Sequence, residues 1–159
     1  MNKIRYAYFE SPLGRLLLTG QDRLQSLHFP KGTTRKEPGK EWVPDPEGFK
    51  DVLEQLEAYF QGELKTFALD LDPQGTPFQE KVWKELVKIP FGETLSYGEL
   101  AHRIGNPKAS RAVGMANGKN PIAIIIPCHR VIGKDGSLTG FGGGLDIKAG
   151  LLEFERANL

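Results

Sequence analysis

The chain has 159 residues, of which 39% are hydrophobic and 26% charged, and its formal net charge is +1. This size fits one domain, or a small domain followed by a slightly larger one, with an ordinary buried core. No apolar run approaches the roughly 20 residues that span a bilayer, and Met1 to Tyr6 lack the apolar stretch of a signal peptide, so we expect a cytoplasmic protein without a membrane partner. The single cysteine excludes an internal disulfide. The cysteine and the three histidines are not spaced as a pair of metal ligands, so we predict no metal site.

The first 75 residues predict a small domain with a mainly antiparallel sheet. Three segments are typical of strands, namely residues 4–9, 15–19 and 24–29. Residues 31–46, rich in charge, glycine and proline, predict a loop. Apolar residues recur at three- and four-residue spacing over residues 49–60, which predicts an amphipathic helix that stops at Gly62. Residues 69–75 then predict a linker, and we place the domain boundary after residue 75.

Residues 76–159 predict a mostly helical domain. Thr76, Pro77 and Gln79 form a capping box with proline at the first helical position, so a helix begins here; it should end at Pro90. A second capping box at Ser96 opens a short helix that closes at Gly105.

A third short helix is predicted to start at Asn106-Pro107 and to run towards Gly118. Two short helices joined by a tight Gly-Asn turn have the outline of a helix-turn-helix. The last helix is expected at about Leu145 to Ala157.

The segment from Leu100 to Lys134 is strongly basic. It contains six lysines and arginines and no acidic residue. Such a patch fits an electrostatic footprint for nucleic acid, or a solvated surface that neighbouring segments neutralise.

The single thiol, Cys128, follows an aliphatic run and Pro127 and precedes His129 and Arg130. A lone cysteine is most often a small buried hydrophobe, but a nucleophilic thiol needs a base or a nearby positive charge. On a tight turn, His129 could reach the sulfur through one water. Glu155 lies at the edge of the apolar stripe of the last helix, where it is either a surface residue or the acceptor that orients the histidine.

Residues 140–144, Gly-Phe-Gly-Gly-Gly, form a glycine-rich segment without the GK[ST] of a phosphate-binding loop. They are either a flexible connector or a backbone kept bare for the close approach of a flat ligand, with Phe141 as one wall.

Taken together, these residues resemble the alkylguanine-DNA alkyltransferases, also called methylated-DNA–protein-cysteine methyltransferases. Pro127-Cys128-His129-Arg130-Val131 is the acceptor signature of that family. Further matching motifs lie upstream, namely Ser96-Tyr97, Gly105-Asn106-Pro107-Lys108, Arg111-Ala112-Val113-Gly114 and Asn120-Pro121. The resemblance covers essentially the whole chain. It implies an α+β protein with a ribonuclease H-like domain over residues 1–75 and a winged-helix-like domain over residues 76–159.

The resemblance also implies the roles of the reacting residues. Cys128 would be the nucleophile and irreversible alkyl acceptor in a single turnover, with His129 as its base through a water and Glu155 orienting that histidine. Asn120 would brace the turn that carries the thiol. Lys148 would lie near the pocket, and no cofactor is implied.

The implied partner is double-stranded DNA with an alkylated guanine, bound by a monomer through the minor groove. Tyr97 would rotate a DNA phosphate and help to neutralise the departing guanine, and Arg111 would fill the space that the flipped nucleotide leaves. The implied DNA-contacting residues are Tyr97, Ala109, Ser110, Arg111, Ala112, Gly114 and Arg130. The implied base-pocket residues are Pro121, Val131, Phe141, Gly142 and Gly143.

Two other functions remain open for this sequence. A lesion sensor would flip the base without accepting the alkyl group, although such proteins lack the cysteine. A cysteine hydrolase would use Cys128, His129 and Glu155, and it would need an oxyanion hole and an attacking water.

Overall fold

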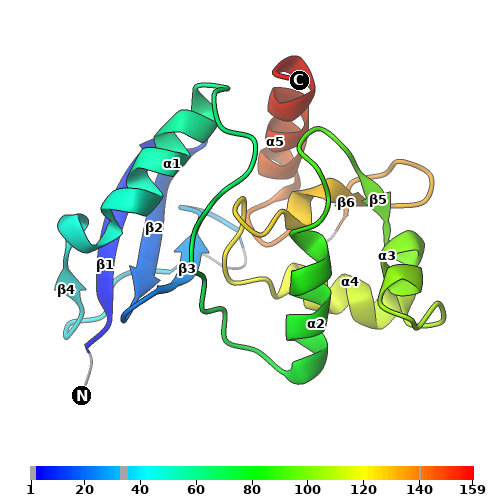
Figure 1. Cartoon of the computed structure of the whole chain (residues 1–159), viewed down its shortest axis with the longest axis horizontal. Coiled ribbons are helices and arrows are strands. Elements are labelled where there is room, and N and C mark those ends of the chain that lie inside the picture. Colours follow the sequence, from blue (N-terminus) through cyan, green and yellow to red (C-terminus); the bar gives the residue numbers. More distant parts are fainter. Residues whose placement is uncertain (1–2, 33–35, 140) are drawn as a thin grey trace.

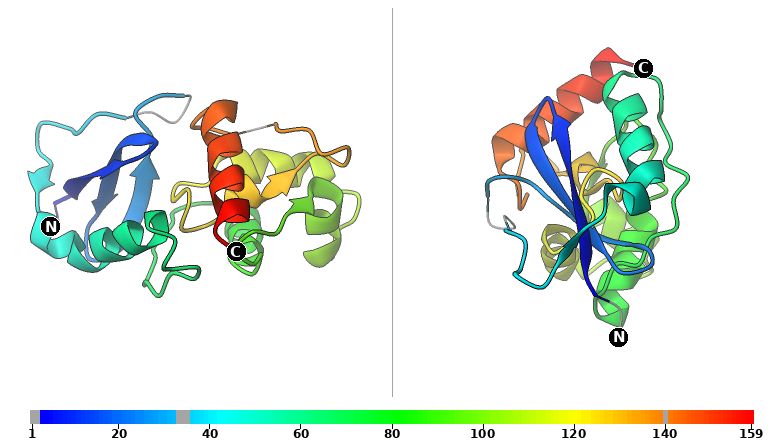
Figure 2. Two further views of the ribbon diagram at one scale, coloured as in Figure 1. Left: turned by 90° about the horizontal axis from the view of Figure 1, so that it is seen from above. Right: turned by 90° about the vertical axis from the view of Figure 1, so that its left-hand side faces the viewer.

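The computed structural model describes residues 3–32, 36–139 and 141–159 and arranges them as two parts (Figure 1). A sheet with one helix forms the N-terminal part, and short helices form most of the C-terminal part. The last helix, α5 (Leu145–Ala157), returns to the boundary between them (Figure 2, left). Residues 33–35 of the predicted loop and Gly140 of the glycine-rich segment lie outside the described residues.

The N-terminal part contains the predicted, mainly antiparallel sheet. Its strands are β1 (Arg5–Ser11), β2 (Gly14–Gly20), β3 (Leu24–His28) and β4 (Val43–Pro44), in the order β3-β2-β1-β4. β2 pairs antiparallel with both β1 and β3, whereas β4 pairs parallel with β1. β4 lies within residues 31–46, for which the prediction of a loop was wrong at this point. The strand is only two residues long and contains Pro44, which an edge strand tolerates because its other side needs no ladder hydrogen bond.

The predicted amphipathic helix is present as α1 (Lys50–Phe60), preceded by a 3₁₀ turn over Pro46–Phe49. Its inner side chains, Val52, Leu56 and Tyr59, are buried. The chain leaves the helix at Gly62, whose φ of 79° is the left-handed conformation that glycine adopts without steric cost.

In the C-terminal part, α2 (Pro77–Leu86) begins at the predicted capping box. Thr76 Oγ1 accepts from the Gln79 amide at 3.1 Å, and Gln79 Oε1 accepts from the Thr76 amide at 2.9 Å. The helix ends at Leu86, four residues before the predicted end at Pro90, and a turn follows it. Trp83 of α2 donates from Nε1 to the Ala116 carbonyl at 2.9 Å, which ties α2 to the fourth helix.

The next helices, α3 (Tyr97–Arg103) and α4 (Ser110–Gly118), follow one another across a short turn, as predicted. The predicted start of α4 at Asn106-Pro107 was wrong. Residues 106–109 form a turn closed by a bond from the Ala109 amide to the Asn106 carbonyl at 3.0 Å. A proline fits the second position of such a turn as well as the first turn of a helix, so the pattern placed the start too early.

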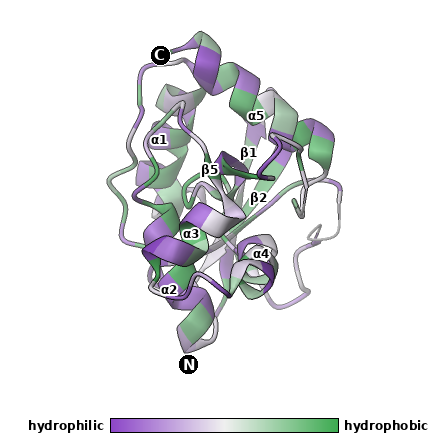
Figure 3. Cartoon of the chain, turned by 90° about the vertical axis from the view of Figure 1, so that its right-hand side faces the viewer, coloured by the Kyte–Doolittle hydropathy of each residue, from purple (hydrophilic) through white to green (hydrophobic). Residues whose placement is uncertain are grey.

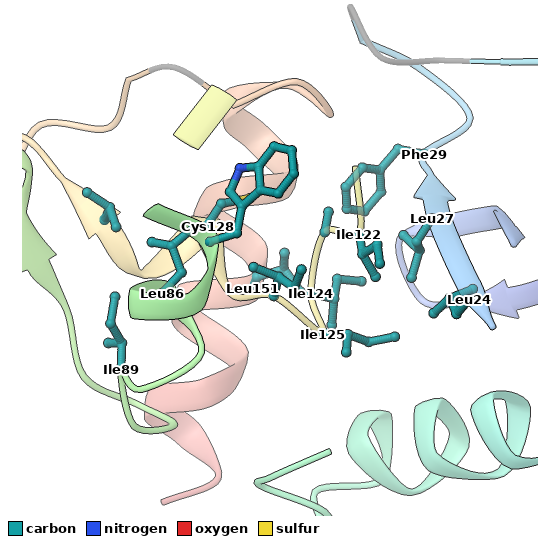
Figure 4. Packing of buried hydrophobic residues seen from close by; sticks show 14 of the residues in the cluster. Leu24, Leu27, Phe29, Leu86, Ile89, Ile122, Ile124, Ile125, Cys128 and Leu151 are labelled. Carbon is teal, nitrogen blue, oxygen red and sulfur yellow. The ribbon is translucent and has the colours of Figure 1, made fainter. Parts of the chain in front are cut away.

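Residues 122–127 connect the two parts. The aliphatic run is a series of turns, in which Ile124 has a φ of 72°. The Leu27 amide of β3 donates to the Pro121 carbonyl at 2.8 Å, and Ile122 forms a parallel bridge with Leu27. Side chains of β3 and of this run pack in one hydrophobic cluster that also contains Cys128 (Figure 4). The two parts therefore share a core.

Two further strands, β5 (Leu95–Ser96) and β6 (Val131–Ile132), pair parallel, although α3 and α4 lie between them in the sequence. They connect the start of α3 to the segment after Cys128. Figure 3 views the molecule from the side on which α3 and α4 lie nearest. Across the described ranges, no helix is long and apolar enough to cross a membrane.

Candidate active site

Cys128 begins a 3₁₀ turn, η2 (Cys128–Arg130), between the aliphatic run and β6. Its side chain is buried, with 5% of its surface exposed. Asn120 lies across the segment before the turn: its Nδ2 donates to the Ile126 carbonyl at 2.7 Å, and its Oδ1 accepts from the Ile122 amide at 3.0 Å. Asn117 of α4 donates to the Cys128 carbonyl at 3.3 Å. The side-chain amides of Asn120 and Asn117 therefore hold the backbone on both sides of the thiol.

His129 and Glu155 form a fully buried pair, with His129 Nε2 at 2.7 Å from Glu155 Oε2. Burial tends to raise the pKa of Glu155, but hydrogen bonds from His129 and Arg130 outweigh it and hold that pKa well below its usual range. The carboxylate is thus ionised and accepts, so Nε2 carries the proton. Burial lowers the pKa of His129, against the hydrogen bond to Glu155, which favours a neutral ring.

The other ring nitrogen, His129 Nδ1, is buried and has no hydrogen-bond partner among the residues that the structure describes. In the neutral ring with Nε2 protonated, Nδ1 is an acceptor. The geometry therefore supplies a histidine that is oriented by a carboxylate and has one nitrogen ready to take a proton.

Arg130 differs from its expected place among the DNA-contacting residues. It is 5% exposed, and its guanidinium donates from Nε to Glu155 Oε1 at 2.8 Å and from Nη2 to Oε2 at 2.9 Å. Its Nη1 donates to the Ile89 carbonyl at 2.6 Å. This bidentate pair faces the interior because a buried carboxylate needs a counter-charge, so we correct the expectation: Arg130 fixes Glu155 instead of facing DNA.

Burial raises the pKa of the Cys128 thiol to about 11, and Asn120 and Lys148 act in the opposite direction. Burial lowers the pKa of Lys148 to about 8. Its Nζ donates to the Val131 carbonyl at 2.6 Å and to the Thr139 carbonyl at 2.8 Å. The thiol is therefore protonated at neutral pH and needs a base to react.

Tyr97, at the start of α3, donates to the same Thr139 carbonyl at 3.0 Å. Tyr97 and Lys148 are thus joined through Thr139, and Lys148 reaches the segment directly after the acceptor turn through Val131. This set of contacts links the acceptor turn to the molecular surface.

An open groove of about 840 Å³ lies at that surface, between α4 on one side and Thr139 with residues 141–145 on the other. Its walls include Tyr97, Arg111, Met115, Phe141, Gly142 and Leu145. Arg111 and Ala112 are exposed, whereas Ala109, Ser110 and Gly114 are half-buried. Five of the six cations between Leu100 and Lys134 are exposed, so the acid-free segment does present positive charge to solvent.

The predicted base-pocket residues separate into two groups. Phe141 and Gly142 line the groove, whereas Val131 is fully buried and Pro121 faces β3 through its carbonyl. Gly143 is also buried. A Cβ atom there would lie 2.5 Å from the Phe29 ring and 2.9 Å from the Phe141 ring, so packing within the chain accounts for glycine at this position.

Sequence reasoning missed three residues beside this site. Tyr59, from α1, donates to Glu155 Oε2 at 2.6 Å. Asn117 supports the Cys128 carbonyl, and Met115 of α4 is 67% exposed at the groove. A polar residue on the inner face of α4 and a large apolar one on its outer face were available signals, but Tyr59 looked like an ordinary core residue.

Comparison with known proteins agrees with this geometry. Residues 77–157 match the family model described as 6-O-methylguanine DNA methyltransferase, DNA binding domain, and residues 4–73 match its ribonuclease-like domain. A methylated-DNA–protein-cysteine methyltransferase of Methanosarcina acetivorans is 57% identical over 151 residues, which are 94% of this chain and 97% of the relative. One from Mycobacterium tuberculosis is 53% identical over 156 residues, 97% of this chain and 93% of the relative.

Solved structures agree as well. The crystal structure of the M. tuberculosis O6-methylguanine methyltransferase has a TM-score of 0.90 at 51% identity, covering 98% of this chain and 94% of that chain. The M. tuberculosis protein in complex with DNA also has a TM-score of 0.90, at 52% identity, covering 97% of this chain and 94% of that chain. The chain therefore belongs to the O6-methylguanine-DNA methyltransferase family, with a ribonuclease-like N-terminal domain and a helical DNA-binding domain.

Proposed function

We propose that this protein repairs alkylated guanine in DNA by direct reversal, with Cys128 as the alkyl acceptor. The observation that carries the proposal is the buried thiol placed next to a histidine that Glu155 orients and whose Nδ1 is free to accept a proton. The names and DNA-bound structure of its relatives support the same substrate.

In the proposed step, the thiol proton passes through one water to His129 Nδ1. The sulfur forms a bond to the alkyl carbon while the bond from that carbon to the guanine O6 breaks. The electron pair of the broken bond stays on the guanine, which takes up a proton with Tyr97 as the first donor. Lys148 stabilises the developing charge near the acceptor turn. The product thioether has no good leaving group, so each molecule acts once.

The DNA would meet the groove beside α4. The alkylated oxygen is inside the duplex, so the base must leave the stack, which costs a few kcal/mol. Arg111, exposed at the groove, would fill the vacated space from the minor groove. Minor-groove and phosphate contacts are largely blind to sequence, which suits a lesion that occurs in any sequence. We further propose that the protein acts as a cytoplasmic monomer whose two domains meet after residue 75.

Mass spectrometry of the intact protein and of its proteolytic peptides, after mixing with methylguanine-containing DNA, tests the acceptor. We expect one methyl group on the peptide containing Cys128 and none in the Cys128→Ser variant, which should still bind the DNA. Binding without a gain in mass would identify a lesion sensor. Continued release of product over many turnovers would identify a hydrolase.

The Arg111→Ala variant tests the DNA-side proposal. We expect repair of a duplex to slow far more than transfer from free O6-benzylguanine, which needs no base flipping. Lys108→Ala, which also removes an exposed cation but lies outside the groove residues, serves as the matched control for loss of charge. Equal loss on both substrates would show that Arg111 does not act in flipping.

A further inference from the structure

The Glu155 carboxylate is enclosed by hydrogen-bond donors. Its Oε1 accepts from Arg130 Nε at 2.8 Å and from the Gly92 amide at 3.1 Å. Its Oε2 accepts from Tyr59 at 2.6 Å, His129 at 2.7 Å and Arg130 Nη2 at 2.9 Å. Of these donors, only the Tyr59 hydroxyl comes from the N-terminal part.

The Tyr59 ring is held firmly in place. It is fully buried, and its centroid lies 5.0 Å from that of Phe60 and 5.4 Å from those of Phe67 and Phe154. Phe91 packs edge-on at 5.9 Å. These rings come from α1, the following segment, α5 and the segment before β5, so the hydroxyl is directed at Glu155 by packing from both parts of the molecule.

We propose that Tyr59 is a positioning residue for the alkyl-transfer reaction: its hydroxyl fixes Glu155 and shares its negative charge, which keeps His129 neutral. The inference rests on the proposed function, in which His129 is the base. Tyr59 and His129 donate to the same oxygen, so each withdraws electron density that would otherwise strengthen the other bond. Without the Tyr59 bond, the carboxylate would stabilise a protonated His129 more strongly.

Burial, followed by the charge of Glu155, raises the pKa of Tyr59 far above its usual range, so the phenol remains a donor at every pH of interest. The other groups around His129 are Arg130 and Cys128 on its own turn and Lys148 and Glu155 on α5. Arg130 and Lys148 both disfavour a charged ring, whereas Glu155 favours it. Tyr59 therefore acts in the same direction as the two cations, without adding a charge.

Tyr59→Phe removes the hydroxyl and keeps the ring. Long-range proton–nitrogen correlation spectra of the free protein report the protonation of His129 directly. We expect its titration midpoint to rise by about one pK unit, the size of a charge-assisted hydrogen bond shared among several donors. Tyr8→Phe is the matched control, because it removes the hydroxyl of a tyrosine that is 41% exposed on β1 and is not among the donors to Glu155.

Site-specific 3-fluorotyrosine at position 59 provides a second, sign-specific test. Its phenol is a stronger donor of the same shape, so the His129 midpoint should fall. An unchanged midpoint in both Tyr59 variants, or an equal shift in Tyr8→Phe, would overturn the proposal.

The rate of transfer from free O6-benzylguanine, measured against pH, connects the titration to the reaction. In Tyr59→Phe, the pH at which the transfer rate rises should increase by the same amount as the His129 midpoint. Transfer should then be about tenfold slower below that midpoint and unchanged well above it. If the His129 midpoint shifts but the pH dependence of the transfer rate does not, the coupling of Tyr59 to His129 is supported. That result would show that His129 is not the base.

Discussion

Replacing Glu155 with glutamine is expected to destabilise the fold strongly, apart from any effect on the reaction. An amide nitrogen cannot accept hydrogen bonds. Whichever way the amide is turned, either two or three of the five donors around Glu155 lose their acceptor. The Arg130 guanidinium is also left buried without its counter-charge. Breaking a buried ion pair from one side costs about 3–5 kcal/mol. We therefore expect Glu155→Gln to lower the free energy of unfolding by about 4 kcal/mol, which corresponds to roughly 12 °C in Tm for a chain of this size.

The loss should depend on pH with a defined sign. The pKa of Glu155 is lower in the folded protein than in the unfolded chain. The extra free energy of unfolding of the wild type over Glu155→Gln is therefore complete above the unfolded pKa of 4.5 and declines as the pH falls towards the folded pKa. Between pH 4.5 and pH 3 the difference between wild type and Glu155→Gln should shrink by about 2 kcal/mol.

Urea unfolding at a series of pH values measures both quantities. Glu153→Gln changes an exposed glutamate of the same helix, and we expect no comparable loss from it. A loss below about 1 kcal/mol at pH 7, or a difference that stays constant down to pH 3, would refute the assignment of Glu155 as the buried centre of this network.

Three further expectations concern the frame of the site, and urea unfolding checks each. Gly143→Ala should cost about 1–3 kcal/mol, because the added methyl group meets the buried Phe29 ring at 2.5 Å; a neutral result would show that the segment can shift. Trp83→Phe should cost about 1–3 kcal/mol and loosen α4, because the Ala116 carbonyl loses its indole donor, and hydrogen exchange in α4 should rise with it. Ser96→Ala should cost about 1 kcal/mol through loss of the α3 cap; an unchanged stability would contradict the capping role.

The sequence predicted those elements whose signals are local. The two capping boxes at Thr76 and Ser96 are made within four residues, and both were found at the predicted positions. The two-residue strands β4, β5 and β6 carry no periodicity, because pairing with a distant segment alone defines them. The start of α4 was misplaced for a related reason, since Pro107 is equally compatible with a turn.

The candidate site divides in the same way. Residues 128–130 are contiguous, and the motif located them, but the motif does not say which way each side chain points. Arg130 turned out to face inward because the 3₁₀ turn directs it to Glu155. Tyr59 lies 96 residues before Glu155, and its role depends on how the two parts meet. A single sequence contains no local signal for such a contact.

Burial of Cys128 has a further consequence, for the lifetime of the protein before it meets damage. A molecule that acts once must keep its thiol intact, and oxidants and free electrophiles attack thiolates much faster than thiols. With 5% of the residue exposed and a pKa of about 11, Cys128 offers such reagents little access and little thiolate. The burial that makes the Cys128 thiol depend on His129 for its deprotonation therefore also protects it from reagents in solution. The thiol is still intact when it meets an alkylated guanine.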